Sequence, residues 1–104
     1  MSELNETIHQ PVRLRIMATL VTLANASELD FTYLRDLLEV TDGNLGAHLR
    51  KLEEAGYIKM NKSFVDRKPR TYVSVTNLGR AAFTGHVDAL KEILKSDQGK
   101  LEKK

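Results

Sequence analysis

Apolar residues recur at steps of three and four along the first half of the chain, which is the spacing typical of amphipathic helices. The first such run starts after Pro11, a residue that suits the first turn of a helix because its missing N–H would have no partner there. It reaches about Asn25, where the polar segment 25–30 interrupts it. A second helix is predicted over 31–40, with Asp30 or Thr32 as its cap. A tight turn at 41–43 leads into a third helix, which Gly56 ends. The predicted inward-facing residues are Val12, Ile16, Met17, Leu20 and Leu23, then Leu34, Leu37 and Leu38, then Leu45, Leu49 and Leu52.

The pattern changes after residue 56. Segments 57–65 and 71–76 alternate or are β-branched and predict two strands, joined by the polar segment 66–70 as a hairpin tip. Helical spacing returns from Asn77 to about Ser96. Three helices followed by a hairpin predict a mainly α (α+β) fold, a winged helix-turn-helix with a two-stranded β-hairpin wing and a C-terminal dimerisation helix. Residues 1–96 are expected to form this single domain and 97–104 a disordered tail. The apolar positions of the last helix are Leu78, Ala82, Val87, Leu90, Ile93 and Leu94.

The composition narrows the function classes. With 104 residues, of which 41% are hydrophobic, the chain is long enough for one modest core. It contains no cysteine, which excludes disulfides, thiolate metal sites and cysteine nucleophiles. The amino terminus has no signal-peptide layout and no apolar run approaches membrane length, so a cytoplasmic protein without a membrane partner is expected.

Charge is distributed unevenly along the chain. Residues 1–43 hold three arginines against seven acidic side chains, whereas residues 44–70 hold seven basic side chains against three acidic ones. A basic middle behind an acidic first half is what a polyanion-binding face requires. The alternative is chance clustering on a solvated surface.

The predicted third helix begins with small residues, although glycine costs about 1 kcal/mol against alanine inside a helix. Its outward face carries Gly43 and Ala47, with Gly46 on the flank, and Arg50 and Lys51 one turn later. Small side chains would let the helix backbone, with its positive dipole end, approach phosphates or base edges. Two purely structural roles stay open as well, namely that Gly43 takes a positive φ in the turn and that Gly46 packs against the second helix.

The polar residues of this helix and of the hairpin are suited to DNA. Asn pairs bidentately with adenine and Arg with guanine, which makes Asn44 and Arg50 the candidate base readers, while Lys usually contacts phosphate. Thr41 or Asp42 is expected to cap the helix. His48 lies between core and surface and is interpreted as a packing or phosphate-contact residue; the alternative is that it reads a base. The hairpin tip is basic and suits phosphates or a neighbouring minor groove through Lys62, Arg67, Lys68 and Arg70.

Segments 41–58 (TDGNLGAHLRKLEEAGYI) and 67–83 (RKPRTYVSVTNLGRAAF) resemble the small winged-helix DNA-binding domains related to the MarR and ArsR transcriptional regulators. The resemblance implies a homodimer that binds operator DNA. It implies recognition-helix contacts through Asn44, Ala47, His48, Arg50 and Lys51, and wing contacts through Arg67, Lys68 and Arg70. Thr41 on the helix and Lys62 on the wing are expected to add DNA contacts.

The chain departs from these families in two respects. It has no cysteine and its three histidines are far apart in sequence, which argues against the metal sensing of ArsR relatives, so no metal and no cofactor are expected. It is also shorter than MarR proteins and leaves less room for a small-molecule effector pocket. Any effector therefore stays unidentified.

The last helix is predicted to form the dimer interface, because its apolar residues exceed what one small domain needs at its edge. The residues concerned are Phe83, Val87, Leu90 and Leu94. The alternative is that this helix packs only on its own core.

The leading hypothesis is thus a homodimeric, sequence-specific double-stranded DNA-binding transcriptional regulator, a repressor by family habit. The rival is a winged helix that serves as a protein-interaction module, which predicts an apolar or acidic recognition face instead of a small, cationic one. RNA binding lacks an aromatic platform. An enzyme is not expected, because no phosphate-binding glycine loop or nucleophile–base pair is present.

Overall fold

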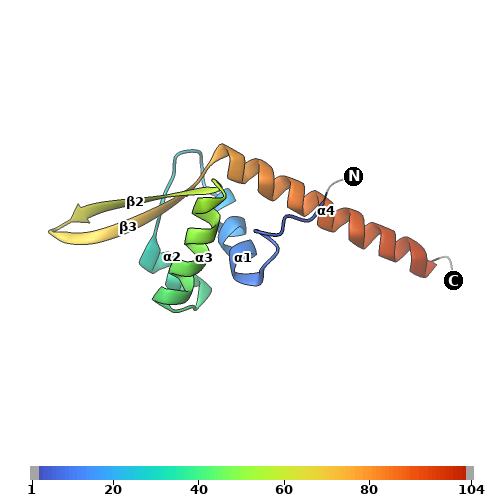
Figure 1. Ribbon diagram of the computed structural model, residues 1–104, viewed down its shortest axis with the longest axis horizontal. Helices are drawn as coiled ribbons and strands as arrows, with labels where there is room; N and C mark the ends of the chain where they lie inside the picture. The colour runs from blue at the N-terminus through green and yellow to red at the C-terminus, as the bar shows by residue number, and fades with distance from the viewer. Residues whose placement is uncertain (1–2, 103–104) are drawn as a thin grey trace.

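The computed structural model describes residues 3–102 and contains four helices and a three-stranded sheet in this part of the chain (Figure 1). The winged-helix prediction is confirmed. The elements in chain order are α1 (Pro11–Val21), β1 (Leu29–Asp30), α2 (Phe31–Leu38), α3 (Asp42–Glu54), β2 (Ile58–Val65), β3 (Lys68–Val75) and α4 (Asn77–Glu102).

Each of the first three helices starts at a side chain that accepts a hydrogen bond from the first turn, which leaves fewer backbone N–H groups without a partner. Gln10 accepts from the N–H of Arg13 (2.8 Å), and Asp30 accepts from the N–H of Thr32 (2.7 Å). Thr41 accepts from the N–H of Asn44 (3.1 Å) and is therefore the cap of α3.

Helix α1 ends at Val21, earlier than the predicted Asn25. Arg80 of α4 contacts this end of α1, because its guanidinium donates to the carbonyls of Val21 (3.0 Å) and Leu23 (2.8 Å). These carbonyls therefore have partners outside a helix.

Helix α2 is shorter than predicted and exposes one residue expected inside. It ends at Leu38 because Glu39 takes a left-handed conformation with φ 55°. Leu34 and Leu38 are buried, whereas Leu37 is 47% exposed. An eight-residue helix covers the core with only one face, and Leu37 lies about 100° from Leu38 around the helix axis, so its prediction as a core residue was wrong.

The sheet has the antiparallel order β1-β3-β2, and its short first strand lies in the segment that the sequence indicated only as a polar break. The wing is a longer and tighter hairpin than predicted. Only Asp66 and Arg67 form the turn, both with positive φ (52° and 66°), and β3 starts at Lys68, within the segment expected to be the loop. A two-residue turn of this kind matches the twist of the strands and so allows the pairing to continue to the tip.

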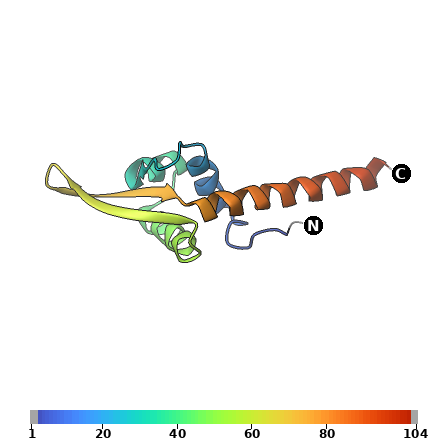
Figure 2. The ribbon, with the colours of Figure 1, turned by 90° about the horizontal axis from the view of Figure 1, so that it is seen from above.

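The core lies where α1, α2 and α3 pack against the base of the hairpin (Figure 2). Ile8, from the segment before α1, is also fully buried there. The fully or nearly fully buried apolar residues of this cluster are Ile8, Ile16, Met17, Leu20, Leu34, Leu38, Leu45, Leu49, Leu52, Ile58 and Val73.

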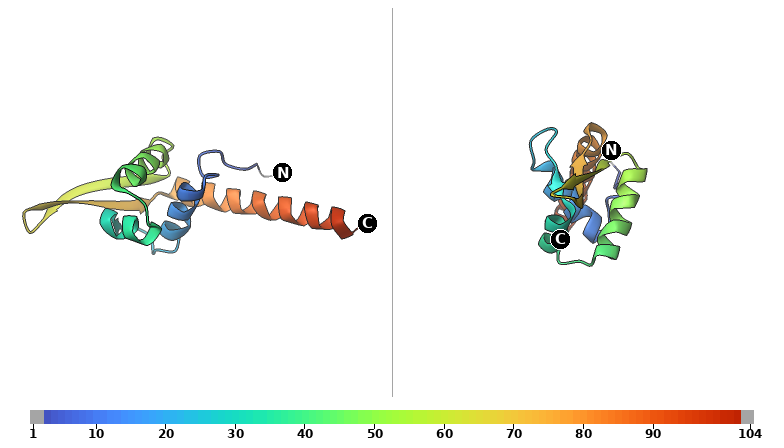
Figure 3. Two further views of the ribbon diagram at one scale, coloured as in Figure 1. Left: turned by 90° about the horizontal axis from the view of Figure 1, so that it is seen from below. Right: turned by 90° about the vertical axis from the view of Figure 1, so that its left-hand side faces the viewer.

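The wing and α4 project from this core in opposite directions (Figures 1 and 3), which gives the molecule extents of 64 × 26 × 22 Å. Helix α4 starts where the Thr76 hydroxyl accepts from the N–H of Gly79 (2.9 Å). It remains helical to Glu102, through much of the segment expected to be a disordered tail.

Candidate nucleic-acid interface

Helix α3 is anchored by one face and exposed on the other. Leu45, Leu49 and Leu52 are fully buried, as predicted. On the opposite side, the side chains predicted to contact DNA remain accessible. The exposed residues of this face are Gly43, Asn44, Ala47, Arg50 and Lys51.

Neither of the two purely structural roles considered for the small residues at the start of α3 agrees with the structure. Gly43 is helical, and the glycine with positive φ in the described part of the chain is Gly56. A Cβ added to Gly43 would have no non-neighbouring atom within 4 Å. At Gly46 it would meet only a guanidinium nitrogen of Arg50, at 3.7 Å, and nothing of α2. The fold of the chain therefore does not require either glycine.

An arginine that the sequence did not single out neutralises the start of this helix. Arg35 of α2 forms ion pairs with Asp42 (2.8 Å), the first residue of α3, and with Asp36 (3.0 Å). Hydrogen bonds to Asp42 and then to Asp36 raise the pKa of Arg35. Asp42 favours the positive end of the helix dipole but would repel a nearby phosphate, and Arg35 offsets this charge. The seven-residue separation of Arg35 and Asp42 spans a turn, so helical spacing could not indicate the pair.

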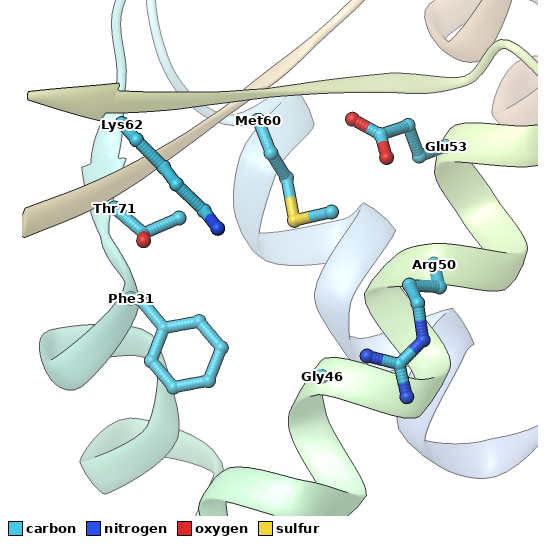
Figure 4. A pocket seen from close by; sticks show the side chains of 7 residues that line it. All are labelled: Phe31, Gly46, Arg50, Glu53, Met60, Lys62 and Thr71. Atoms are coloured by element: carbon cyan, nitrogen blue, oxygen red, sulfur yellow. The ribbon is translucent and has the colours of Figure 1, made fainter.

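Arg50 of α3 and Lys62 of β2 line one hollow, of about 680 Å³, between the recognition helix and the wing (Figure 4). Phe31 and Met60 supply apolar surface to it, and Gly46 leaves its α3 side open. The two elements predicted to contact DNA thus border a single concave surface, which carries two cations, Arg50 and Lys62, and one acidic side chain, Glu53.

Lys51 lies on a different flank of α3 from Arg50. It lines a separate hollow of about 430 Å³ together with Arg13 and with two acidic residues, Glu6 and Glu54. The cationic residues of α3 consequently occupy two flanks of its exposed face, with Ala47 one turn before them.

His48 is held by α1. A guanidinium nitrogen of Arg13 lies 3.1 Å from His48 Nδ1, and Arg13 also donates to the carbonyl of Thr7. Burial lowers the pKa of His48, and the charge of Arg13 lowers it further. A neutral ring accepts this hydrogen bond at Nδ1 and keeps its N–H at Nε2. The geometry is compatible with both a packing role and a phosphate contact for His48, because the ring packs on α1 and its Nε2–H remains a donor.

The basic residues of the wing differ in their surroundings. Arg70 forms an ion pair with Asp30 (2.9 Å), the cap of α2, and so ties the wing to the body. Burial raises the pKa of Asp30, but the hydrogen bonds from Arg70 and from two backbone N–H groups outweigh it and leave the pKa below its ordinary value. Lys62, Arg67 and Lys68 are exposed and form no ion pair within residues 3–96.

Comparison with known proteins identifies the class to which these features belong. Residues 12–94 match the family model described as a winged helix DNA-binding domain, and the chain belongs to this family. It is accordingly a DNA-binding transcription regulator and not an enzyme.

The chain is similar to several individual proteins. A transcriptional regulator homologue from Pyrococcus horikoshii is 33% identical, with a TM-score of 0.79 and 88% of each chain covered. An uncharacterised protein of Methanocaldococcus jannaschii is 38% identical over 82% of this chain and 89% of its own length. A putative MarR-family regulator from Enterococcus faecalis shares the fold at 23% identity, with a TM-score of 0.65 over 93% of this chain and 81% of its own.

The described residues were also compared with what a membrane span and a metal site require. None of the helices in this part of the chain is long and apolar enough to cross a membrane. Across the same residues, no group of three or more His, Asp or Glu side chains is arranged to hold a metal ion.

Proposed function

We propose that this protein is a homodimeric, sequence-specific regulator that places α3 in the major groove of operator DNA and the wing on the adjacent backbone or minor groove. The observation that carries the proposal is the bare start of α3. Two glycines weaken the helix, and neither has a packing or backbone reason within the described residues. A partner that must approach the helix backbone closely supplies the missing reason.

Asn44 and Arg50 are proposed to read bases, and Thr41, His48 and Lys51 to contact phosphates. Asn44 and Arg50 are exposed, and their side chains make no hydrogen bond to another residue in the described part of the chain. The small side chain of Ala47, which lies between Asn44 and Arg50 on α3, would let the helix backbone come close to the DNA. On the wing, Lys62, Arg67 and Lys68 are proposed to contact the backbone, whereas Arg70 contributes mainly by holding the wing against Asp30.

Helix α4 is proposed to pair with its copy in a second chain. Phe83, Val87, Leu90 and Leu94 lie within one narrow sector of the helix, and Leu94 is 62% exposed. This part of α4 projects away from the other described helices and from the sheet (Figure 1). A symmetric dimer would set two recognition helices about 34 Å apart and select a palindromic site.

Repression is the sign of regulation that we propose. Occupancy of an operator that overlaps a promoter excludes polymerase sterically and needs no contact beyond those to DNA.

The substitution Gly43→Ala combined with Gly46→Ala tests the proposal directly. The double variant should unfold at higher urea concentration, by roughly 1 kcal/mol in free energy, because alanine favours the helix. It should also bind duplex DNA at least about 1 kcal/mol more weakly, because two methyl groups then crowd the interface. Affinity is measured on a duplex recovered by selection from a random pool, which also reveals whether the site is a palindrome.

The matched control is Gly85→Ala. Gly85 is a helical glycine of α4 whose added Cβ also meets nothing within 4 Å, and it lies on the side of α4 opposite Leu94. This variant should be stabilised with unchanged DNA affinity. Equal affinity of the double variant and the wild type would contradict the proposed role of α3.

The dimer is tested separately by Leu94→Lys, which should shift sedimentation equilibrium toward the monomer. Ser96→Lys introduces the same charge on the opposite side of α4 and should leave the association unchanged. A monomeric wild type at micromolar concentration would refute the dimer without refuting DNA binding.

A further inference from the structure

The tip of the wing carries an exposed aromatic side chain among basic residues. Phe64 is 77% exposed, the highest value among the large apolar residues that the described part of the chain leaves in water. Burying a phenylalanine stabilises a folded chain, so leaving one in water forgoes this stabilisation. A hairpin needs no aromatic at its tip in order to form, so the fold alone does not account for this residue.

The hairpin holds this side chain in a defined position. Eight residue pairs join β2 and β3, and the two-residue turn at Asp66 and Arg67 closes them. Phe64 lies directly opposite Pro69. Because Val65 and Lys68 flank the turn as a hydrogen-bonded pair, the next pair is a non-hydrogen-bonded one, in which the missing N–H of proline costs no ladder bond. Phe64 and Pro69 thus form a preorganised apolar tip.

Strand alternation sets the direction in which Phe64 points. Residues two apart share a face, so Phe64 lies on the same face of β2 as Lys62 and Met60, which line the hollow beside α3 (Figure 4). Val65, its neighbour, lies on the other face. The aromatic side chain therefore belongs to the face of the wing that the recognition helix shares.

The charge around the tip matches a polyanion. Lys62, Arg67 and Lys68 are exposed within a few residues of Phe64 and have no ion-pair partner within residues 3–96. A nucleic-acid groove places phosphates on both sides of an inserted side chain, where these three cations would contact them.

We infer that Phe64, supported by Pro69, inserts as a wedge between base pairs in the minor groove beside the recognition site and kinks the DNA there. The inference rests on the proposed function and adds to it a residue that distorts DNA instead of reading it. Phenylalanine is among the apolar side chains that unstack base steps in this way, with kinks of about 20–90°. The wedge would favour flexible pyrimidine–purine steps at the position of the wing, and so add specificity without a base-edge hydrogen bond.

Three variants of the full chain separate this role from hairpin stability. Phe64→Thr removes the ring but keeps a residue that favours strands. Phe64→Leu keeps an apolar wedge. Val65→Thr is the matched control, because it changes the adjacent apolar residue, 41% exposed, on the opposite face of the same hairpin. Thermal unfolding of each variant confirms that it folds.

The measurement uses the duplex recovered by selection. DNA bending is followed by energy transfer between dyes at the duplex ends, and unstacking by the fluorescence of 2-aminopurine placed at successive positions under the wing. The wild type should bend the duplex by at least about 20° and raise the fluorescence at one step. Phe64→Thr should lose both signals and bind about tenfold more weakly, the loss expected for one aromatic–base stack. Phe64→Leu should keep most of the bend, and Val65→Thr all of it.

Each outcome is decisive. A folded Phe64→Thr variant that still binds, bends and unstacks the duplex like the wild type would overturn the wedge and leave the proposed function intact. A Phe64→Thr variant with altered self-association and unaltered DNA bending would assign Phe64 to a protein contact and overturn it equally. Failure of the wild type to bind any duplex would overturn the proposed function and the wedge together.

Discussion

Glycines have opposite roles at the start of α3 and at the junction that connects α3 to α4. At the junction, Gly56 has a φ of 81° that disfavours other residues, and a Cβ on Gly79 of α4 would lie 2.1 Å from the carbonyl oxygen of Tyr57. At the start of α3, a Cβ on Gly43 would meet nothing, and one on Gly46 would meet only the Arg50 guanidinium at 3.7 Å. The first pair is required by the fold and the second is not. A glycine in a sequence therefore acquires a meaning only from what its missing side chain would touch.

The polar groups around these glycines show the same contrast. At the junction between α3 and α4, the Thr76 hydroxyl donates to the carbonyl of Gly56 (2.6 Å) and accepts from Gly79, so its hydrogen-bonding capacity is used within the chain. On the exposed face of α3, the side chains of Asn44 and Arg50 have no such partner in the described residues. The junction is built for stability, and the exposed face of α3 is left available for a ligand.

The largest expected effect is that of Gly79→Ala. The added methyl group would overlap the backbone of Tyr57, which no rotamer change can relieve, so the free energy of unfolding should fall by at least about 3 kcal/mol. Urea denaturation measures the loss. Gly85→Ala, in open space on the same helix, should raise stability instead, and similar behaviour of the two variants would erase the contrast between required and dispensable glycines.

Arg50→Ala should weaken DNA binding and leave the free energy of unfolding almost unchanged. Its exposed side chain contributes little to folding, but the loss of a base contact should weaken operator binding by about 1–3 kcal/mol and relax specificity at one base position. Competition binding with single-base variants of the recovered site measures both effects. An equal loss on every sequence would reassign Arg50 to a phosphate contact.

Lys68→Ala should weaken binding to all duplexes alike. Removal of one phosphate contact lowers the slope of log affinity against log salt by about 1. Titrations at several salt concentrations measure this slope, and Arg70→Ala offers a comparison, since its partner Asp30 lies within the protein. Salt-independent affinity of the wild type would contradict the proposed electrostatic role of the wing.

The smallest expected effect is a pH dependence of folding stability that arises from the buried His86. His86 is 1% exposed and accepts a hydrogen bond at Nδ1 from the N–H of Asn5 (3.0 Å), while Nε2 lies 3.4 Å from His9 Nδ1. Burial lowers the pKa of His86 from its ordinary value of 6.5, and the neighbouring His9 lowers it further.

The unfolded chain protonates His86 at a higher pH than the folded chain does. The contribution of neutral His86 to the free energy of unfolding is therefore fully present above about pH 6.5 and is lost as the pH falls below this value. Urea unfolding at a series of pH values measures the decline. His86→Gln should reduce the decline, and His48, whose pKa is also lowered, accounts for part of the remainder. An unchanged decline in this variant would show that His86 is not responsible.

The recognition helix was the most predictable region. Leu45, Leu49 and Leu52 are buried because their 3.6-residue periodicity leaves a single helix orientation that covers them, and this orientation exposes Arg50 on the other side. The short helix α2 was less predictable. Its three leucines are equally apolar, and only the position of α1 and α3 determines that Leu34 and Leu38, but not Leu37, are covered.

The sequence by itself determined the order of the four helices and the wing, the basic middle of the chain and the polar residues available to DNA, because periodicity, capping and charge act over a few neighbouring residues. Tertiary structure decided what depends on distant segments. It paired Arg70 with Asp30 and Arg35 with Asp42, and it closed the wing with two residues so that Phe64 stands at the tip. It also left Gly43 without a neighbour, since empty space beside a residue is a property of the packed molecule and not of its sequence.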